Sequence, residues 1–358
     1  MTGLYIHVPF CVRKCRYCDF YSGSFSEEAA EKYTEAVIRN IAAYNIKADT
    51  VYFGGGTPSL LSSRQFDRIL SAADISDNAE ISIECNPKTA DEKKLADFRS
   101  VGINRLSIGV QSFNDTELKA AGRIHSADEA ADTILAAEKS GFENISADLM
   151  LGLPYQTPDS LNISLKRLAE LPVRHISAYM LKVEENTPLA KDISLLENIP
   201  DDDGMADMYI QTCDFLKAHG FGRYEISNFA KDGFECRHNL IYWRCEDYLG
   251  IGPSAHSCYG GKRFAVDRNT DEFISSPRQI IHVTDDSPCG YGERIMLALR
   301  LREGINAEDY PFSAELMKNA APLEKGGFVK INGTNISLTD SGCLVSNEVI
   351  CRIVGDNI

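Results

Sequence analysis

Three cysteines near the N-terminus are the residues whose type and spacing most clearly indicate chemistry. Cys11, Cys15 and Cys18 have the spacing C-x3-C-x2-C within the string VPFCVRKCRYCDFYS. Three thiolates this close together can bind three irons of a [4Fe–4S] cluster and leave the fourth iron open to another ligand. The chain contains eleven cysteines, and this odd number excludes full disulfide pairing within one chain.

A zinc site and a redox dithiol are the two alternatives to an iron–sulfur cluster at these cysteines. A structural zinc ion is normally closed by four ligands, and no second Cys or His pair follows at a suitable spacing. Cys15 and Cys18 form a C-x-x-C pair that could act as a redox dithiol, but this use leaves Cys11 unexplained. The spacing therefore favours an iron–sulfur cluster with one open iron.

Further candidate residues lie near the ends of predicted strands. The run Gly54–Thr57 follows an apolar segment, and glycines let the backbone approach a ligand closely and expose N–H groups to it. The alternative is a tight turn in which Pro58 begins the next helix. Four polar side chains in or near other strand ends could bind an amine, ribose hydroxyls or a carboxylate: Glu84, Gln111, Arg123 and Asp148.

The elements that must position these residues alternate along the first half of the chain. Apolar runs predict six strands: Leu4–Val8, Thr50–Phe53, Glu80–Cys85, Arg105–Val110, Ile145–Leu149 and His175–Leu181. Helical periodicity lies between them, with start signals at Ser26, at Ser126 with Glu129, and at Thr157–Pro158. Six βα units in about 180 residues predict an α/β fold with an open, partial (β/α)6 barrel, because a full barrel needs about 250 residues.

This organisation predicts three parts. Residues 1–182 form the partial barrel, and residues 183–288 form a less regular extension with an acidic linker and loops rich in Gly, Asn and aromatic residues. Residues 289–358 form a small α+β domain resembling a winged helix, in which Asn332–Gly333 marks a hairpin turn. That last part has 7 Lys and Arg against 9 Asp and Glu, so DNA binding is not expected.

Composition excludes several classes of protein. The 358 residues have a net charge of −15 and a pI near 5.0, which argues against binding nucleic acid through general charge attraction. No run of about 18 apolar residues predicts a membrane span. The N-terminal residues have no basic region followed by a long apolar segment, so no export signal is expected and the predicted location is the cytoplasm.

The cysteine spacing after the first strand of a partial barrel resembles the radical S-adenosylmethionine (SAM) superfamily. In that superfamily the methionine amine and carboxylate of SAM bind the open iron, and an electron from the cluster splits SAM into methionine and a 5′-deoxyadenosyl radical. Longer strings, YIHVPFC, FGGGTPSLL, INRLSIGVQSFND, DLMLGLPYQT and YEISNFA, resemble the oxygen-independent coproporphyrinogen III oxidases and the related heme chaperone family HemW.

The resemblance implies a set of cofactor contacts. Tyr5 precedes the cluster loop and Tyr17 precedes its third cysteine, and both would lie near SAM. Gly55, Gly56 and Thr57 would meet its methionine end, and Ala178 could contact its adenine. By the same resemblance the amine, ribose and carboxylate would be held by Glu84, Gln111, Arg123 and Asp148. For Tyr5 and Ala178 the alternative is ordinary packing in the barrel.

Three departures from the oxidase pattern favour the heme chaperones. The oxidases carry a fourth cysteine two residues after the third, where this chain has Phe20, and they carry an extension before the first strand. His238–Trp243 reads HNLIYW, which resembles the HN-x-x-YW signature of the chaperones. A neutral imidazole can bind heme iron, so His238 is the predicted heme ligand, with His256 a second candidate. The alternative is that His238 only makes structural hydrogen bonds.

The predicted function is therefore a heme chaperone on a radical SAM scaffold, with a [4Fe–4S] cluster, SAM and heme as cofactors. Its predicted partners are heme, a heme-acceptor protein and a reductant such as flavodoxin or ferredoxin. Nucleic acid is not an expected partner, and a membrane would be met only transiently through an acceptor. The alternative function is oxygen-independent coproporphyrinogen III oxidation, a radical decarboxylation to protoporphyrinogen IX.

Overall fold

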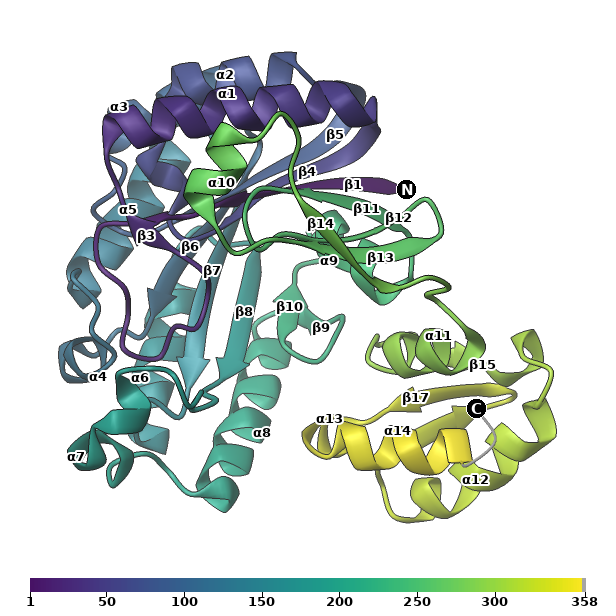
Figure 1. The fold of residues 1–358 in the computed structure, drawn as a ribbon. Helices are drawn as coiled ribbons and strands as arrows, with labels where there is room; N and C mark the ends of the chain where they lie inside the picture. Colours follow the sequence, from purple (N-terminus) through teal and green to yellow (C-terminus); the bar gives the residue numbers. More distant parts are fainter. Residues whose placement is uncertain (356–358) are drawn as a thin grey trace.

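The chain forms a large curved sheet flanked by helices, followed by a small C-terminal domain (Figure 1). The structure is a computed structural model that describes residues 1–355. All six predicted strands are present and lie parallel to one another: β1 (Thr2–Val8), β4 (Lys47–Gly55), β5 (Asp74–Cys85), β6 (Arg105–Gln111), β7 (Asn144–Leu151) and β8 (His175–Met180). The prediction of an α/β partial barrel is confirmed.

The helices between these strands begin at the predicted caps. Ser26 accepts a hydrogen bond from the Ala29 N–H at the start of α1 (Glu27–Tyr44). Ser126 and Glu129 form a capping box at α5 (Ala127–Lys139), and Thr157 caps α6 (Pro158–Ala169). The remaining helices beside the barrel strands are α2 (Ser63–Ser71), α3 (Glu92–Ser100), α4 (Asp115–Ala120) and α8 (Asp202–Ala218). Because these helices cover the outside, the polar strand ends are left to form a site at one end of the barrel.

The sheet continues beyond the six predicted strands. β11 (Asp247–Ile251) pairs in parallel with β1, so a late segment of the chain returns to the N-terminal edge. The order continues through β12 (His256–Tyr259), β13 (Lys262–Val266) and β14 (Ile281–Asp285). The opposite edge carries β10 (Asn228–Ala230) and β9 (Gly222–Arg223). The strands β11 to β14 therefore belong to the same sheet as β1.

Two local predictions in this region are wrong. The acidic segment expected as a linker at 199–204 instead contains the start of α8, because Asp201 accepts a hydrogen bond from the Gly204 N–H and caps the helix. The HNLIYW segment, expected in a loop, forms most of helix α9 (Arg237–Trp243). Its apolar and aromatic side chains pack against the first strands of the barrel, which stabilises a short helix that has no side-chain cap.

The C-terminal domain contains a three-stranded sheet of order β15 (Ile305–Asn306), β17 (Asn335–Leu338) and β16 (Val329–Asn332). The last two strands form the predicted hairpin around Asn332–Gly333. The domain's helices are α11 (Tyr291–Ala298), α12 (Ser313–Lys325), α13 (Asp340–Leu344) and α14 (Ser346–Val354). Figure 1 shows this domain beside the barrel, joined to it by the segment that leads from β14 to α11. No helix within residues 1–355 is long and apolar enough to cross a membrane.

Candidate functional site

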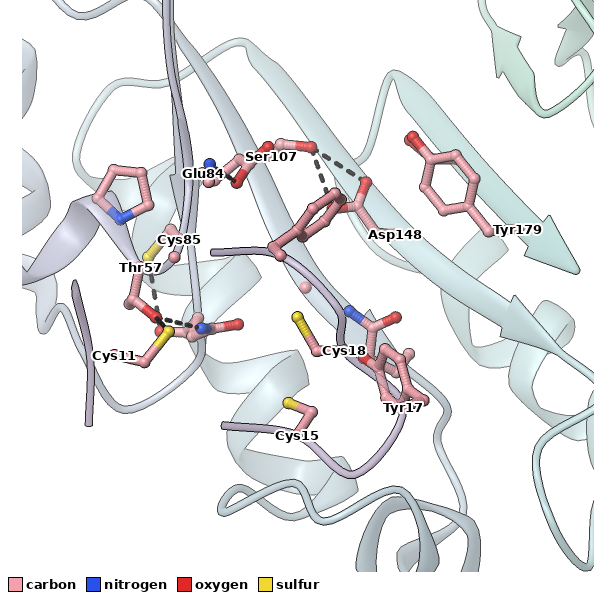
Figure 2. Close-up of a pocket in the computed structure, with 18 of the residues that line it drawn as sticks. Cys11, Cys15, Tyr17, Cys18, Thr57, Glu84, Cys85, Ser107, Asp148 and Tyr179 are labelled. Atoms are coloured by element: carbon pink, nitrogen blue, oxygen red, sulfur yellow. Dashed lines mark hydrogen bonds between the residues drawn. The ribbon is translucent and has the colours of Figure 1, made fainter. Parts of the chain in front are cut away.

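A cavity of about 520 Å³ opens at the carboxyl ends of the parallel strands. Parallel sheets place polar side chains together at this end, where barrel proteins bind their ligands. Of the fourteen predicted site residues, these line the cavity: Cys11, Cys15, Tyr17, Cys18, Gly55, Gly56, Thr57, Glu84, Gln111, Arg123 and Asp148. Figure 2 shows the three cysteines at one end of it, with Glu84 and Asp148 at the other.

Cys11 ends the short strand β2 (Phe10–Cys11), and Cys15 and Cys18 lie in the loop that follows, which backbone hydrogen bonds hold against the barrel. The Arg16 N–H donates to the Ala121 carbonyl (3.0 Å), and the Leu189 N–H donates to the Arg16 carbonyl (2.9 Å). None of the three cysteines forms a disulfide, and all three are partly exposed. Burial raises the pKa of the Cys18 thiol.

A chain of hydrogen bonds connects two of the three sulfurs. The Thr57 hydroxyl donates to the Cys11 sulfur (3.5 Å), and the Asn86 amide donates to Thr57 (3.0 Å). Arg123 donates to the Asn86 carbonyl oxygen (2.6 Å) and to the Cys15 sulfur (3.3 Å). Hydrogen bonds and a cation beside the sulfurs are the means by which proteins stabilise an anionic cluster. Asn86 follows a predicted strand, but its type and position did not predict a connection with the cysteines.

This donor set fits an iron–sulfur cluster. Each cysteine of a [4Fe–4S] site binds a different iron, so its ligands surround a cluster instead of converging on one ion. The three thiols do line one cavity, and Arg123 supplies a positive charge beside them. Within residues 1–355, no group of three or more His, Cys, Asp or Glu side chains is arranged to hold a single metal ion.

The glycine run has a different role from the predicted one. The N–H groups of Gly55, Gly56 and Thr57 are already bonded, to the Glu84 carboxylate (3.1 Å), the Val8 carbonyl (2.9 Å) and the Phe10 carbonyl (2.7 Å) respectively. They are therefore not free donors for a ligand, although all three residues line the cavity. A Cβ on Gly56 would lie 2.5 Å from the Phe10 oxygen, so the lack of a side chain allows the cysteine loop to lie against this turn.

Two carboxylates at the far end of the cavity hold protons more tightly than usual. Burial, followed by the charge of Asp148, raises the pKa of the Glu84 carboxyl to about 8. Burial also raises the pKa of Asp148, although the Ser107 hydroxyl donates to it at 3.0 Å. Such shifted groups in a cleft are typical of binding and catalytic sites. A cationic ligand would favour the ionised form of both carboxyls and could then pair with them. The contributions of Ser107 and of Tyr179, which also lines the cavity, were not predicted.

The remaining predicted residues do not line this cavity. Ala178 is 1% exposed within β8. His238 is fully buried, and its two ring nitrogens are hydrogen-bonded to Thr50 (2.7 Å) and to the Tyr242 hydroxyl (2.7 Å). A heme iron needs an accessible, uncommitted nitrogen, so this geometry favours the structural alternative for His238 over heme ligation.

A second cavity of about 410 Å³ lies directly beside the first. The two share Asp19 and Phe20 as lining residues. The second is also lined by Tyr5, His7, Tyr21, Tyr242, Tyr248, Ser254, His256 and Arg268. Tyr5 was predicted to lie near SAM but lines this cavity instead. The sequence did not predict the cavity, because its walls come from residues 5–21 and 242–268, which are far apart in the sequence.

Comparison with known proteins agrees with the geometry of the first cavity. Residues 5–168 match the family described as the radical SAM superfamily, and residues 291–345 match the HemN C-terminal domain. Superfamily membership implies a [4Fe–4S] cluster and SAM. The solved structure of coproporphyrinogen III oxidase from Escherichia coli has a similar fold, with a TM-score of 0.82 and 24% identity, over 98% of this chain and 89% of that one.

Several relatives with greater sequence similarity are named heme chaperones. The heme chaperone HemW of Haemophilus influenzae is 40% identical over 97% of this chain and 96% of its own length. The protein of the same name from Bacillus subtilis is 34% identical over 99% of this chain and 100% of its own length. The HemW of Lactococcus lactis is 31% identical over 100% and 98%. The chain therefore belongs to the HemW heme chaperone family within the radical SAM superfamily.

Proposed function

We propose that this protein is a cytoplasmic heme chaperone that binds heme and passes it to an acceptor protein. Its functional parts are the cluster-bearing barrel (1–182), an extension that contributes to the heme site (183–288) and the small C-terminal domain (289–358). A small electron carrier such as flavodoxin or ferredoxin is the proposed reductant. The full-length similarity to heme chaperones supports this proposal, and the second cavity is the observation that carries it.

In the first cavity, Cys11, Cys15 and Cys18 hold the [4Fe–4S] cluster. When bound, the cluster and SAM together supply one-electron chemistry. Glu84 and Asp148 bind the positively charged end of SAM, and Arg123 holds the Cys15 sulfur while its charge offsets that of the cluster. Tyr17, Gln111 and the turn formed by Gly55, Gly56 and Thr57 complete the walls. Ala178 supports these walls by packing within β8, and Tyr5 lines the second cavity.

The second cavity has the chemistry that a porphyrin requires. The rings of Tyr242 and Tyr248 meet edge to face, with centroids 4.6 Å apart, and both line the cavity. Flat aromatic walls are favourable surfaces for a macrocycle. Its volume lies within the range of about 300–1,000 Å³ that is usual for pockets that bind small molecules and cofactors.

His256 is the imidazole available to a heme iron. Its side chain is exposed, and its ring has no hydrogen bond to any part of residues 1–355. His7 lines the same cavity, but its nitrogens are engaged by the Tyr5 hydroxyl (3.1 Å) and the Tyr21 carbonyl (2.9 Å). We assign His256 as the axial ligand, and we assign exposed Arg268 to a heme propionate because a guanidinium binds carboxylates well.

Phe20 separates the two proposed sites. This side chain is 66% exposed and lines both cavities. It occupies the position at which the oxidases carry their fourth cysteine, so an apolar ring here replaces a thiol between cluster and porphyrin. We therefore favour a chaperone that binds and releases heme over an oxidase that acts on the side chains of a porphyrinogen.

A product assay distinguishes the two functions. The reconstituted, reduced protein is incubated anaerobically with SAM and coproporphyrinogen III, and the porphyrins and 5′-deoxyadenosine are quantified. In parallel, heme is titrated into the same preparation. We expect heme binding near one equivalent and no protoporphyrinogen IX. Formation of protoporphyrinogen IX in proportion to the SAM consumed would contradict the chaperone function.

A further inference from the structure

Three cysteines outside the cluster loop lie together where the barrel meets the C-terminal domain. Cys258 is in β12, and its sulfur is 3.8 Å from that of Cys289. Cys289 lies in the connector between β14 and α11. Cys245 follows α9, and its thiol is within hydrogen-bonding reach of Cys289. Three chain segments that are distant in sequence thus bring their thiols to one point.

The backbone is held in an unusual conformation at two of these residues. Cys245 has φ 51° and Cys289 has φ 66°, in the left-handed region that residues with a Cβ seldom adopt. Surrounding contacts hold Cys289 in place: its N–H donates to Glu293 (2.7 Å), and Arg294 donates to its carbonyl (2.7 Å). Such conformations concentrate at functional positions.

The close approach of the two sulfurs suits disulfide formation, although burial keeps the thiols protonated and so slows attack by the thiolate. Burial raises the pKa of Cys258 and of Cys289 to about 11, so both are neutral thiols at neutral pH. A sulfur–sulfur bond of about 2.0 Å requires the two atoms to approach by less than 2 Å. Rotation of the two side chains about χ1 can supply this movement while the Cys289 backbone keeps its hydrogen bonds to Glu293 and Arg294.

The pair also lies against the second cavity. Cys258 is the direct cross-strand partner of Tyr248, and the Tyr248 ring lines that cavity. A bond that draws Cys258 toward the connector therefore acts on one wall of the proposed heme site. Trp243, the only tryptophan in the chain, precedes Cys245 by two residues and can report the change.

We propose that Cys258 and Cys289 form a reversible disulfide that lowers the affinity of the second cavity for heme. The oxidant is a small-molecule disulfide. One cysteine thiolate displaces a thiolate from it, and the second then attacks the mixed disulfide, so the two cysteines lose two protons and two electrons and two small thiols are released. The proposed disulfide depends only on the geometry of the thiols, whereas its proposed effect on heme affinity also depends on the proposed function.

The test uses the full-length protein with its cluster reconstituted, kept anaerobic in buffers of increasing oxidised to reduced glutathione. After acid quenching and alkylation, peptide mass spectrometry should show a Cys258–Cys289 link that dithiothreitol removes. Trp243 emission should fall with the same midpoint. Cys258→Ser and Cys289→Ser should abolish both changes, whereas Cys351→Ser, which alters an exposed cysteine elsewhere, should leave both intact.

Heme titrations of the oxidised and reduced protein complete the test. We expect oxidation to weaken heme binding at least threefold in the wild type and to leave Cys289→Ser unchanged. Absence of the linked peptide, a dominant Cys245–Cys289 link, or a Cys258–Cys289 link with unchanged heme affinity would overturn the proposal. A protein that forms the disulfide but binds no heme in either state would contradict the proposed function while supporting the disulfide.

Discussion

The Arg123 guanidinium donates a hydrogen bond to the Cys15 sulfur at 3.3 Å. The same side chain also donates to Asn86 and to the Gly109 carbonyl, each at 2.6 Å. Arg123 therefore joins the cysteine loop to two neighbouring barrel strands and places a half-buried positive charge beside a proposed cluster ligand. Positive charge and hydrogen bonds near cluster sulfurs favour the reduced, more negative state.

Arg123→Gln should make the reduction potential of the cluster more negative. Loss of the cation removes stabilisation of the reduced state, and we expect a fall of at least about 60 mV, which corresponds to a tenfold change in a one-electron equilibrium. Potentiometric titration followed by electron paramagnetic resonance measures the change. Arg123→Lys should recover part of it, and Arg99→Gln, at an exposed arginine, should have no effect. Equal potentials in wild type and Arg123→Gln would remove Arg123 from the cluster site.

Glu84→Gln should stabilise the cofactor-free protein at alkaline pH. The pKa of Glu84 is about 8 in the folded protein, above its ordinary value of 4.5. The folded state therefore binds more protons than the unfolded state between these values, and stability falls as pH rises through that window. Because the side chain faces a water-accessible cavity, we expect a gain of only about 2 kcal/mol at pH 8.

Urea denaturation at pH 4.5 and pH 8 measures this difference in the free energy of unfolding. The wild type and Glu84→Gln should have similar stability near pH 4.5 and diverge toward pH 8. Glu138→Gln, at an exposed helix position, serves as the control. A Glu84→Gln variant with the pH profile of the wild type would show that Glu84 ionises normally.

His238→Gln should destabilise the protein at neutral pH by about 2–4 kcal/mol, because it disturbs two buried hydrogen bonds in a packed site. Burial, followed by the charge of Arg105, lowers the pKa of His238 to about 3. The unfolded state binds the extra proton between about 3 and 6.5, so wild-type stability falls as pH falls through this window.

The difference between wild type and His238→Gln should therefore shrink from pH 7 to pH 4. Denaturation at both pH values checks this, with His219→Gln on the surface as the control. A constant difference would show that His238 is not held neutral by the core.

The sequence predicted the elements that have strong local signals. Six apolar runs of adequate length and clear helix caps specified the barrel strands and helices, so the cavity at the strand ends could be anticipated with its cysteines and carboxylates. β11 could not be predicted in this way, because it has only five residues and pairs in parallel with β1 across more than 240 positions of the sequence. Pairing over such a distance leaves no periodic pattern in the sequence.

The same limit applies to the second cavity and to His238. A motif identifies residue types, but whether an imidazole faces a cavity or the core depends on the helix that carries it. α9 directs His238 toward Thr50 in β4, whereas β12 leaves His256 exposed at the cavity. The contacts that bury His238 and expose His256 come from segments that are distant in the sequence.

Heme binding in the second cavity is tested most directly by heme titration of the folded, reconstituted protein. Absorption and electron paramagnetic resonance spectra of the ferric complex then identify the iron ligand. His256→Ala should weaken heme binding at least tenfold and change the axial-ligand spectrum, and Arg268→Gln should weaken binding without changing that spectrum. His282→Ala, at an exposed histidine paired with Asp267, should match the wild type. Unchanged affinity and spectrum in His256→Ala, together with a lost ligand signal in folded His238→Gln, would contradict the assignment of heme to the second cavity.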